Sequence, residues 1–122
     1  MFFKKHKAKP ISPQEELALL IKSYSLFKDD ISCLGKHDHY DLIEETVTIR
    51  DGIHDWLQDI DVSEDVKSQI SRLDQAWREW ITQNKSSDFE LVDINRDNIA
   101  RSQWWFWIDQ LDKLSEEDLK TI

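Results

Sequence analysis

The first part of the chain alternates apolar and polar residues with the spacing of a helix that buries one face. Its apolar residues follow one another at intervals of three and four positions: Leu17, Leu20, Tyr24, Phe27, Ile31 and Leu34. Ser12, Pro13 and Glu15 precede this seam, and a capping Ser followed by Pro and Glu is a typical helix start. Gly35 supplies a C-terminal stop. The pattern predicts a helix over residues 13–34.

The second periodic segment, residues 38–60, has an apolar face and an acidic face. At about 100° per residue, one sector contains a set of mainly apolar residues: Leu42, Thr46, Ile49, Ile53, Trp56, Leu57 and Ile60. The opposite sector contains carboxylates: Asp41, Glu44, Glu45, Asp51, Asp55 and Asp59. We therefore expect an amphipathic helix whose apolar side packs on the core and whose acidic side faces away from it.

Two further helices and a short terminal one complete the pattern. Residues 63–84 carry a narrow apolar stripe: Val66, Ile70, Leu73, Trp77, Trp80 and Ile81. A similar stripe predicts a helix over residues 95–113: Ala100, Trp104, Trp107, Ile108, Leu111 and Leu114. Ser115 is predicted to be the N-cap of a short helix near the end of the chain. The stretch between the third and fourth helices is expected to be a connection that packs over the bundle end.

The predicted fold is all-α, a four-helix up-and-down bundle with a short C-terminal helical segment, because the connections between helices are short. The chain has only two Gly and two Pro, whereas all-β proteins need such residues in their turns. Residues 1–11 are predicted to be a basic, flexible N-terminal segment, and residues 12–122 a single helical-bundle domain. Seven residues are expected in the core: Phe27, Ile49, Ile53, Leu73, Trp77, Trp104 and Ile108.

Charge is concentrated in the second predicted helix. Between Asp38 and Asp65 the chain has ten carboxylates and one cation, Arg50, which gives a net charge of −9. Carboxylates at i and i+4, such as Asp55 and Asp59, repel each other by about 0.2–0.5 kcal/mol per pair. A solvated helix face is the simplest explanation, but tolerance of this repulsion also favours a basic protein partner. Nucleic-acid binding is disfavoured, because the acidic chain would repel phosphates.

Five consecutive large apolar residues, 104–108, cannot all lie on one side of an α-helix. If Trp104 faces the core, Trp105 and Phe106 point away from it and can anchor a partner. The alternative is that this helix is covered on two sides. Arg101 lies four residues before Trp105 and is expected to lie over its ring.

The first predicted helix has a second, weaker apolar stripe formed by Leu19, Leu26 and Cys33, seven residues apart. A helix in a four-helix bundle needs only one stripe. The second stripe therefore predicts either wide burial of this helix within the domain or a homo-oligomer interface.

No motif in the sequence brings together residues for catalysis, metal binding or cofactor binding. Asp51 and His54 alone have the i, i+3 spacing of a bundle metal site, and their side chains point to different parts of the helix. Cys33 has no cationic neighbour that the sequence fixes, and the chain contains neither a glycine-rich phosphate loop nor a nucleophile elbow. We therefore predict no catalytic residue, no metal and no cofactor.

The sequence thus favours a non-enzymatic protein-binding module, which uses the acidic helix face and the Trp105/Phe106 ridge. An inhibitor or immunity-type neutraliser of a basic partner would fit this description. The alternative is a small all-helical metal- or ligand-binding protein, or a hydrolase, that uses the carboxylates and histidines of residues 37–55. A cytoplasmic location is expected, because Cys33 is the only cysteine and no apolar run reaches the roughly 20 residues that span a bilayer.

Overall fold

The computed structural model of the chain describes residues 12–26, 39–84, 89–91 and 94–122. These residues are mainly helical and contain no strand, so the predicted all-α class is confirmed. The elements are the α-helices α1 (Pro13–Ser25), α3 (His39–Asp59) and α4 (Glu64–Asn84), the 3-10 helix η3 (Trp104–Lys113) and the short α-helix α5 (Glu116–Leu119). None of the helices in these ranges combines the length and the apolar character needed to cross a bilayer.

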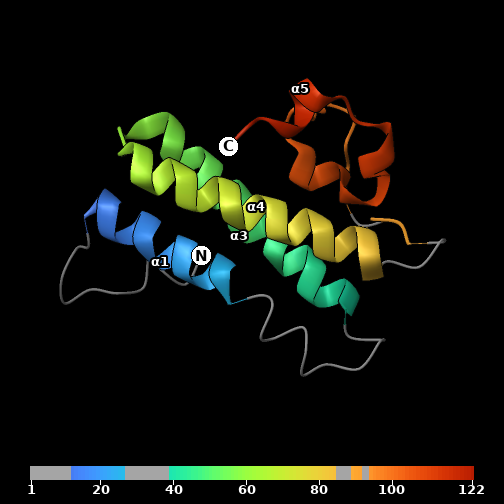
Figure 1. Cartoon of the computed structure of the whole chain (residues 1–122), viewed down its shortest axis with the longest axis horizontal. Coiled ribbons are helices and arrows are strands. Elements are labelled where there is room, and N and C mark those ends of the chain that lie inside the picture. Colours follow the sequence, from blue (N-terminus) through green and yellow to red (C-terminus); the bar gives the residue numbers. More distant parts are fainter. Residues whose placement is uncertain (1–11, 27–38, 85–88, 92–93) are drawn as a thin grey trace.

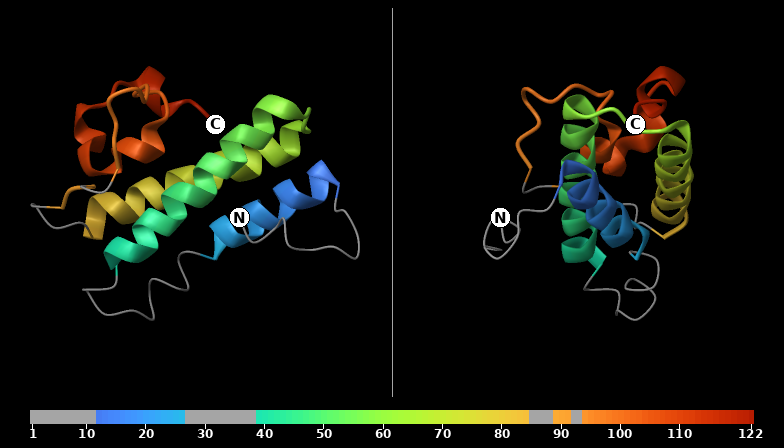
Figure 2. Two further views of the ribbon diagram at one scale, coloured as in Figure 1. Left: turned by 180° about the vertical axis from the view of Figure 1, so that it is seen from behind. Right: turned by 90° about the vertical axis from the view of Figure 1, so that its left-hand side faces the viewer.

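Helices α3 and α4 run antiparallel to each other in the middle of the structure (Figure 1) and are referred to below as a pair. Helix α1 packs on one side of this pair, mainly against α3, and the C-terminal segment with η3 and α5 packs on the other side (Figure 2). Helix η3 contacts both α3 and α4. The central pair therefore has two covered sides.

Serine side chains cap the starts of α1, α4 and α5, and two of these, Ser12 and Ser115, were expected from the sequence. The Ser12 hydroxyl accepts a hydrogen bond from the Glu15 backbone N–H, and the Ser63 hydroxyl accepts one from the Val66 backbone N–H. Ser115 forms a complete capping box with Asp118. Each of these contacts satisfies a backbone donor that the first turn of a helix leaves unpaired.

The fourth predicted helix is wrong in type and in extent. Residues 95–103 form turns and bends, and η3 contains two breaks in its helical geometry, at Trp107 (φ −121°, ψ 24°) and Gln110 (φ −132°, ψ 32°). A 3-10 helix has about three residues per turn, and the two breaks interrupt it, so one continuous α-helical stripe over residues 95–113 does not form. With three long α-helices among the described residues, the four-helix up-and-down arrangement is not confirmed.

The first predicted helix ends earlier than expected, because α1 stops at Ser25 and Leu26 is its C-cap. Residues 27–38, with the predicted core residue Phe27, lie outside the described residues. The second and third predicted helices match α3 and α4 to within one residue at each end.

The core lies between the α3/α4 pair and its two covering layers. Four of the predicted core residues are fully buried: Ile53, Trp77, Trp104 and Ile108. Ile49 and Leu73 lie at the edge of the core and keep part of their surface exposed. Both still pack against the buried cluster.

Gly52 lies inside α3 at the contact with α1. A Cβ atom at this position would lie 3.4 Å from Leu20 Cδ1 and 3.8 Å from Leu20 Cδ2, which is ordinary van der Waals contact with a flexible side chain. The backbone of Gly52 has no positive φ that would require glycine. An alanine methyl group therefore fits at this position.

Gly52→Ala should stabilise the fold by about 0.5–1 kcal/mol, because Gly costs this much relative to Ala inside a helix. Urea unfolding followed by circular dichroism measures the change. Gly52→Leu is the matched control and should destabilise, because its larger side chain overlaps Leu20. Loss of stability in the Ala variant would mean that α1 and α3 cannot accommodate even a methyl group.

Candidate functional site

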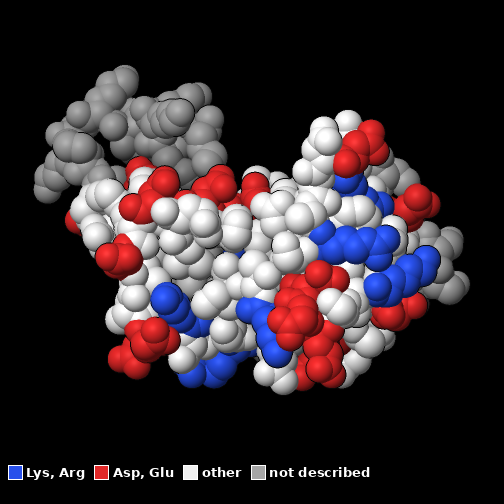
Figure 3. Space-filling model, turned by 90° about the horizontal axis from the view of Figure 1, so that it is seen from above, with Lys and Arg blue, Asp and Glu red and all other residues white. Residues whose placement is uncertain are grey.

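The acidic face of α3 is largely at the surface. The carboxylates of Asp41, Glu45, Asp55 and Asp59 belong to exposed residues, and Glu44 is half-buried. Figure 3 shows a row of acidic side chains, with no basic one among them, over the C-terminal half of α3. Near the other end of the helix, a shallow hollow of about 400 Å³ is lined by Asp41, Glu44, Glu45, Thr48 and Ile94. The structure therefore brings most of the predicted acidic residues to one helix surface.

Arg50, the one cation of this acidic stretch, is not at that surface. Its side chain is 0% exposed and forms a two-pronged ion pair with Asp74 of α4. Arg50 Nε lies 2.8 Å from Asp74 Oδ1, and Arg50 Nη2 lies 3.1 Å from Asp74 Oδ2. Because Arg50 is turned inward and is paired there, it does not neutralise the exposed carboxylates of α3.

Tyr24 connects α1 to this ion pair. Its hydroxyl donates a hydrogen bond of 2.5 Å to Asp74 Oδ1, and its ring is fully buried. Burial raises the pKa of Tyr24 well above its ordinary value, and the negative charge of Asp74 raises it further. Tyr24 therefore remains a hydrogen-bond donor at neutral pH. Together, Tyr24, Arg50 and Asp74 form a buried polar network that joins α1, α3 and α4.

Two tryptophans of η3 cover the network from the opposite side. The Arg50 guanidinium carbon lies 4.2 Å from the centre of the Trp105 ring and 5.7 Å from that of Trp104. Arg78 of α4 lies 4.5 Å from the Trp104 ring. A guanidinium over an indole face is a favourable cation–π arrangement, and it is stronger when water is excluded.

Hydrogen bonds of the indole N–H groups fix both rings. Trp105 Nε1 donates to Asp51 Oδ1 at 3.2 Å, and Trp104 Nε1 donates to the Thr121 carbonyl at 3.0 Å. The first bond attaches η3 to α3, and the second attaches the end of the chain to η3. The position of each ring is therefore set by contacts at both its face and its edge.

These contacts correct the expectations for the aromatic ridge. Trp105 is fully buried, so the expectation that it points away from the core is wrong, and its ring is not an exposed anchor. Phe106 is half-buried and packs against the core. Arg101 lies over the Trp107 ring, at 5.3 Å, and not over Trp105, where Arg50 is found. The cause is that side chains from both α3 and α4 cover this segment: Arg50 lies over Trp105 and Trp104, and Arg78 lies over Trp104.

Asp51 also differs from its expected environment. It is half-buried and faces Trp105, although the helical pattern placed it on the acidic surface. Burial raises its pKa above the ordinary value, and the hydrogen bond from Trp105 partly opposes this shift. Of the six predicted acidic residues, Asp51 is therefore the one that belongs to the contact between α3 and η3.

The histidines do not form a metal site in the part of the chain that the structure describes. No three His, Cys, Asp or Glu side chains are grouped there as they would be around a metal ion. The His54 ring lies 4.9 Å from that of Trp105, and its Nδ1 lies 3.4 Å from the Ile122 carbonyl oxygen. His37 and the side chain of His39 lie outside the described residues.

A second, partly buried ion pair was also missed by the sequence patterns. Arg96 donates to both carboxylate oxygens of Asp109, at 2.6 and 3.0 Å, and Asp109 Oδ2 accepts a hydrogen bond from the Leu91 backbone N–H. This pair holds the connection before η3 onto η3 itself. For Asp74 a signal existed, because it lies between Ile70 and Trp77 on the apolar stripe of α4.

Asp74→Ala should destabilise the fold by about 3–5 kcal/mol, because it leaves the Arg50 guanidinium buried without a counter-charge. Tyr24→Phe should cost only about 1 kcal/mol, since Arg50 continues to satisfy Asp74. The triple variant Tyr24→Phe/Arg50→Met/Asp74→Leu should recover most of the loss, because it removes the buried charges together. Urea unfolding of the three variants measures these differences. A triple variant no more stable than Asp74→Ala would contradict the assignment of the cost to an unpaired charge.

Asp51→Asn should leave stability at pH 7 unchanged or raise it, because the amide oxygen still accepts from Trp105 and no charge is desolvated. The pKa of Asp51 is raised in the folded protein, so the stability it contributes is full below its unfolded pKa and is lost as pH rises through its folded pKa. Thermal unfolding from pH 3 to pH 7 should show a smaller loss of this kind in the Asn variant. Asp51→Ala is the control for the lost Trp105 acceptor, and it should be less stable than Asp51→Asn.

In comparisons with protein-family models, with curated proteins and with solved structures, no match was found for this chain. Two features of the described residues bear on function: the exposed carboxylates of α3 and the buried network that holds α3 in place.

Proposed function

We propose that the chain is a non-enzymatic protein-binding module whose exposed α3 carboxylates bind a basic surface of a partner protein. The observation that carries the proposal is the inward position of Arg50. Since its guanidinium is buried and bound to Asp74, the surface of α3 presents acids without a compensating cation among its own residues.

The cost of this arrangement supports a role for the acids. Two exposed pairs with i, i+4 spacing, Asp41/Glu45 and Asp55/Asp59, repel each other by about 0.2–0.5 kcal/mol each. A lysine in place of one member would remove the repulsion. A basic partner surface offsets the same repulsion on binding and also speeds association through long-range attraction.

The dimensions of the acidic face suit a protein surface better than a small ligand. Asp41 and Asp59 are separated by about 27 Å along the helix axis, at 1.5 Å per residue. The helix is held on its other side by Arg50 and on its flank by Asp51, so the row of carboxylates is rigid before binding. A rigid surface loses less conformational entropy on association than a flexible one.

An inhibitor or immunity-type neutraliser that covers a basic surface is the most specific form of this proposal, and it includes a cytoplasmic location. Trp105 has no part in it, because its ring is buried. Phe106 keeps the partner-binding role only as a prediction from the sequence. Among the described residues, no three His, Cys, Asp or Glu side chains are grouped as around a metal ion, so we place second the alternative of a metal- or ligand-binding protein or hydrolase built from residues 37–55.

Affinity capture from the native host tests the proposal with two variants of equal net charge. The first neutralises the α3 surface: Asp41→Asn, Glu45→Gln, Asp55→Asn and Asp59→Asn. The control neutralises exposed acids elsewhere: Asp97→Asn, Asp112→Asn, Glu116→Gln and Glu117→Gln. A partner that the wild type and the control capture, and that the α3 variant does not, would support the proposal. Equal capture by all three proteins would contradict it.

With the captured partner in hand, the association rate should fall by about tenfold or more between 0.02 and 0.2 M salt, because screening weakens steering by the acidic face. Stopped-flow or surface-plasmon measurements give this rate. Urea unfolding of the α3 variant should show stability equal to or above that of the wild type, since self-repulsion is removed. A salt-independent association rate would exclude α3 as the steering surface.

A further inference from the structure

Arg78 of α4 takes part in no ion pair within the described residues. Asp74 lies one turn earlier on α4, but its two oxygens already accept hydrogen bonds from Arg50 and Tyr24. Burial lowers the pKa of Arg78 below its ordinary value, and the negative charge of Asp74 partly opposes this shift. Because an arginine side chain keeps its proton, Arg78 retains a positive charge that still lacks a bound acceptor.

The guanidinium of Arg78 has an enclosed side and an open edge. Its carbon lies 4.5 Å from the centre of the Trp104 ring, and its Nη1 atom is buried without an acceptor among the described residues. Its Nε and Nη2 atoms are not buried, and they too donate no hydrogen bond to a described residue. Arg50 binds the carboxylate of Asp74 through the same two atoms, Nε and Nη2. The open edge of Arg78 is therefore the edge that can bind a carboxylate with two parallel hydrogen bonds.

A hollow of about 600 Å³ adjoins Arg78, between α4 and the C-terminal segment. Leu111 of η3 and Leu119 of α5 supply its apolar lining, and Glu79 and Asp112 bring two exposed carboxylates to it. The other residues that line it carry no charge. The lining thus combines one cation, two carboxylates and an apolar surface. This pattern is complementary to a ligand with both an ammonium and a carboxylate group, and it disfavours a dianion, which both carboxylates would repel.

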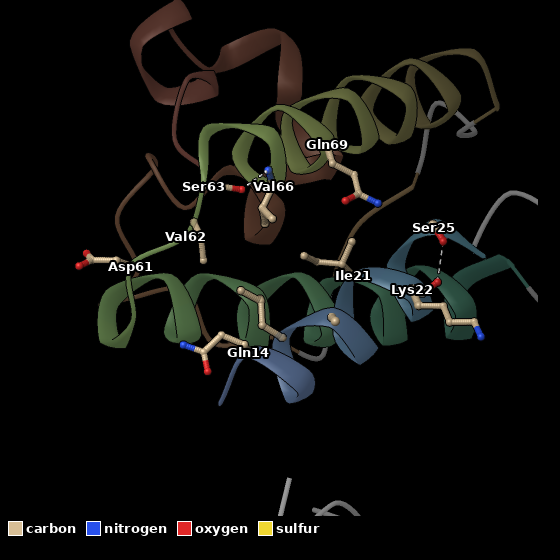
Figure 4. A pocket seen from close by; sticks show the side chains of 11 residues that line it. Gln14, Ile21, Lys22, Ser25, Asp61, Val62, Ser63, Val66 and Gln69 are labelled. Atoms are coloured by element: carbon tan, nitrogen blue, oxygen red, sulfur yellow. Dashed lines mark hydrogen bonds between the residues drawn. The ribbon is translucent and has the colours of Figure 1, made fainter. Parts of the chain in front are cut away.

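The hollow between α1 and the first turns of α4 differs in this respect (Figure 4). It has a volume of about 420 Å³ and a largely aliphatic lining, with Lys22 at its margin. Lys22 is exposed, and none of the described residues that line this hollow has a buried side-chain polar atom without a partner. Lys22 therefore serves as a control for the loss of a positive charge from the lining of a hollow.

We propose that the hollow beside Arg78 binds an apolar α-amino acid, whose carboxylate accepts hydrogen bonds from Nε and Nη2 of Arg78. The ammonium group of the ligand then faces Glu79 and Asp112, and its side chain packs against Leu111 and Leu119. Two parallel hydrogen bonds from a guanidinium fix the orientation of the carboxylate. The volume of the hollow lies within the range of small-molecule sites, so a branched aliphatic amino acid such as leucine fits.

This site is separate from the proposed partner surface. It uses α4, η3 and α5, whereas the partner would meet the exposed carboxylates of α3. Variants of the hollow keep the α3 carboxylates, so binding of the amino acid and capture of the partner are measured independently. The two proposals can therefore fail separately.

NMR titration of the isotope-labelled full chain with leucine tests the site. Leucine should shift a localised set of resonances with a dissociation constant of about 0.1–1 mM, which is the affinity expected of so small a ligand. Leucinamide, which lacks the carboxylate, and inorganic phosphate should each bind about tenfold more weakly or less. Absence of leucine binding up to about 20 mM, or equal binding of leucinamide, would overturn the proposal.

Two variants with the same change of net charge locate the carboxylate of the ligand. Arg78→Gln should weaken leucine binding by about tenfold or more, because the guanidinium is lost, whereas Lys22→Gln should bind leucine as the wild type does. Circular dichroism and urea unfolding establish that both variants are folded. Equal affinity of the two variants for leucine would overturn the assignment of Arg78.

A double variant that leaves the core unchanged locates the ammonium group. Glu79→Gln/Asp112→Asn alters exposed residues only and should weaken leucine binding by about threefold or more, because the partners of the ammonium group are neutralised. The same variant should bind N-acetyl-leucine more tightly than the wild type does, because that ligand has a carboxylate and no ammonium group. A change in the same direction for both ligands, or no change for either, would overturn the proposed orientation.

Discussion

The structure depends on a permanently charged guanidinium at the centre of its core. Arg50 is fully buried, and an arginine side chain cannot release its proton to escape the cost of burial. Its positive charge must therefore be stabilised by groups from other elements. Asp74 of α4 supplies the carboxylate, and Tyr24 of α1 completes the hydrogen bonding of that carboxylate. Trp105 of η3 covers the guanidinium with its ring. Each layer of the fold thus contributes one group to the same buried network, in which Asp74 alone supplies the counter-charge.

The aromatic segment contributes to this requirement with two neighbouring rings. Trp105 covers the guanidinium, and the Trp104 ring lies against Trp105 with centroids 5.6 Å apart. In η3 both rings are buried and both lie near the guanidinium. The geometry at Trp107 and Gln110 departs from a helix, and the segment gains two indole faces over a charge and two indole hydrogen bonds. Such buried polar contacts favour one arrangement of the layers over others, because an alternative packing would strand a charge.

The parts of the fold that periodicity could predict are those with local causes. Helices α3 and α4 were predicted to within one residue at each end, because a single apolar stripe defines each of them. The network was not predicted, because Arg50 and Asp74 are 24 residues apart and no local pattern pairs them. Arg50 was counted as one charge in an acidic stretch, although its neighbours Ile49 and Ile53 belong to the apolar sector. The acidic surface was predicted in outline, but the inward position of Asp51 depends on Trp105, which is 54 residues away.

The buried network and the acidic surface both follow from the way α3 is oriented. Because Arg50 is required inside, α3 has no cation left to neutralise its outer carboxylates. Its exposed charge is therefore higher than the sequence alone implies. Asp51 lies between the two environments: its oxygen holds Trp105 over Arg50, and its neighbour Asp55 is at the surface. Rigid packing on the inner side fixes the spacing of the outer acids, since α3 cannot rotate without breaking the contacts of Arg50 and Asp51. A partner would thus meet a preformed row of carboxylates whose position is set by a charge that it never contacts.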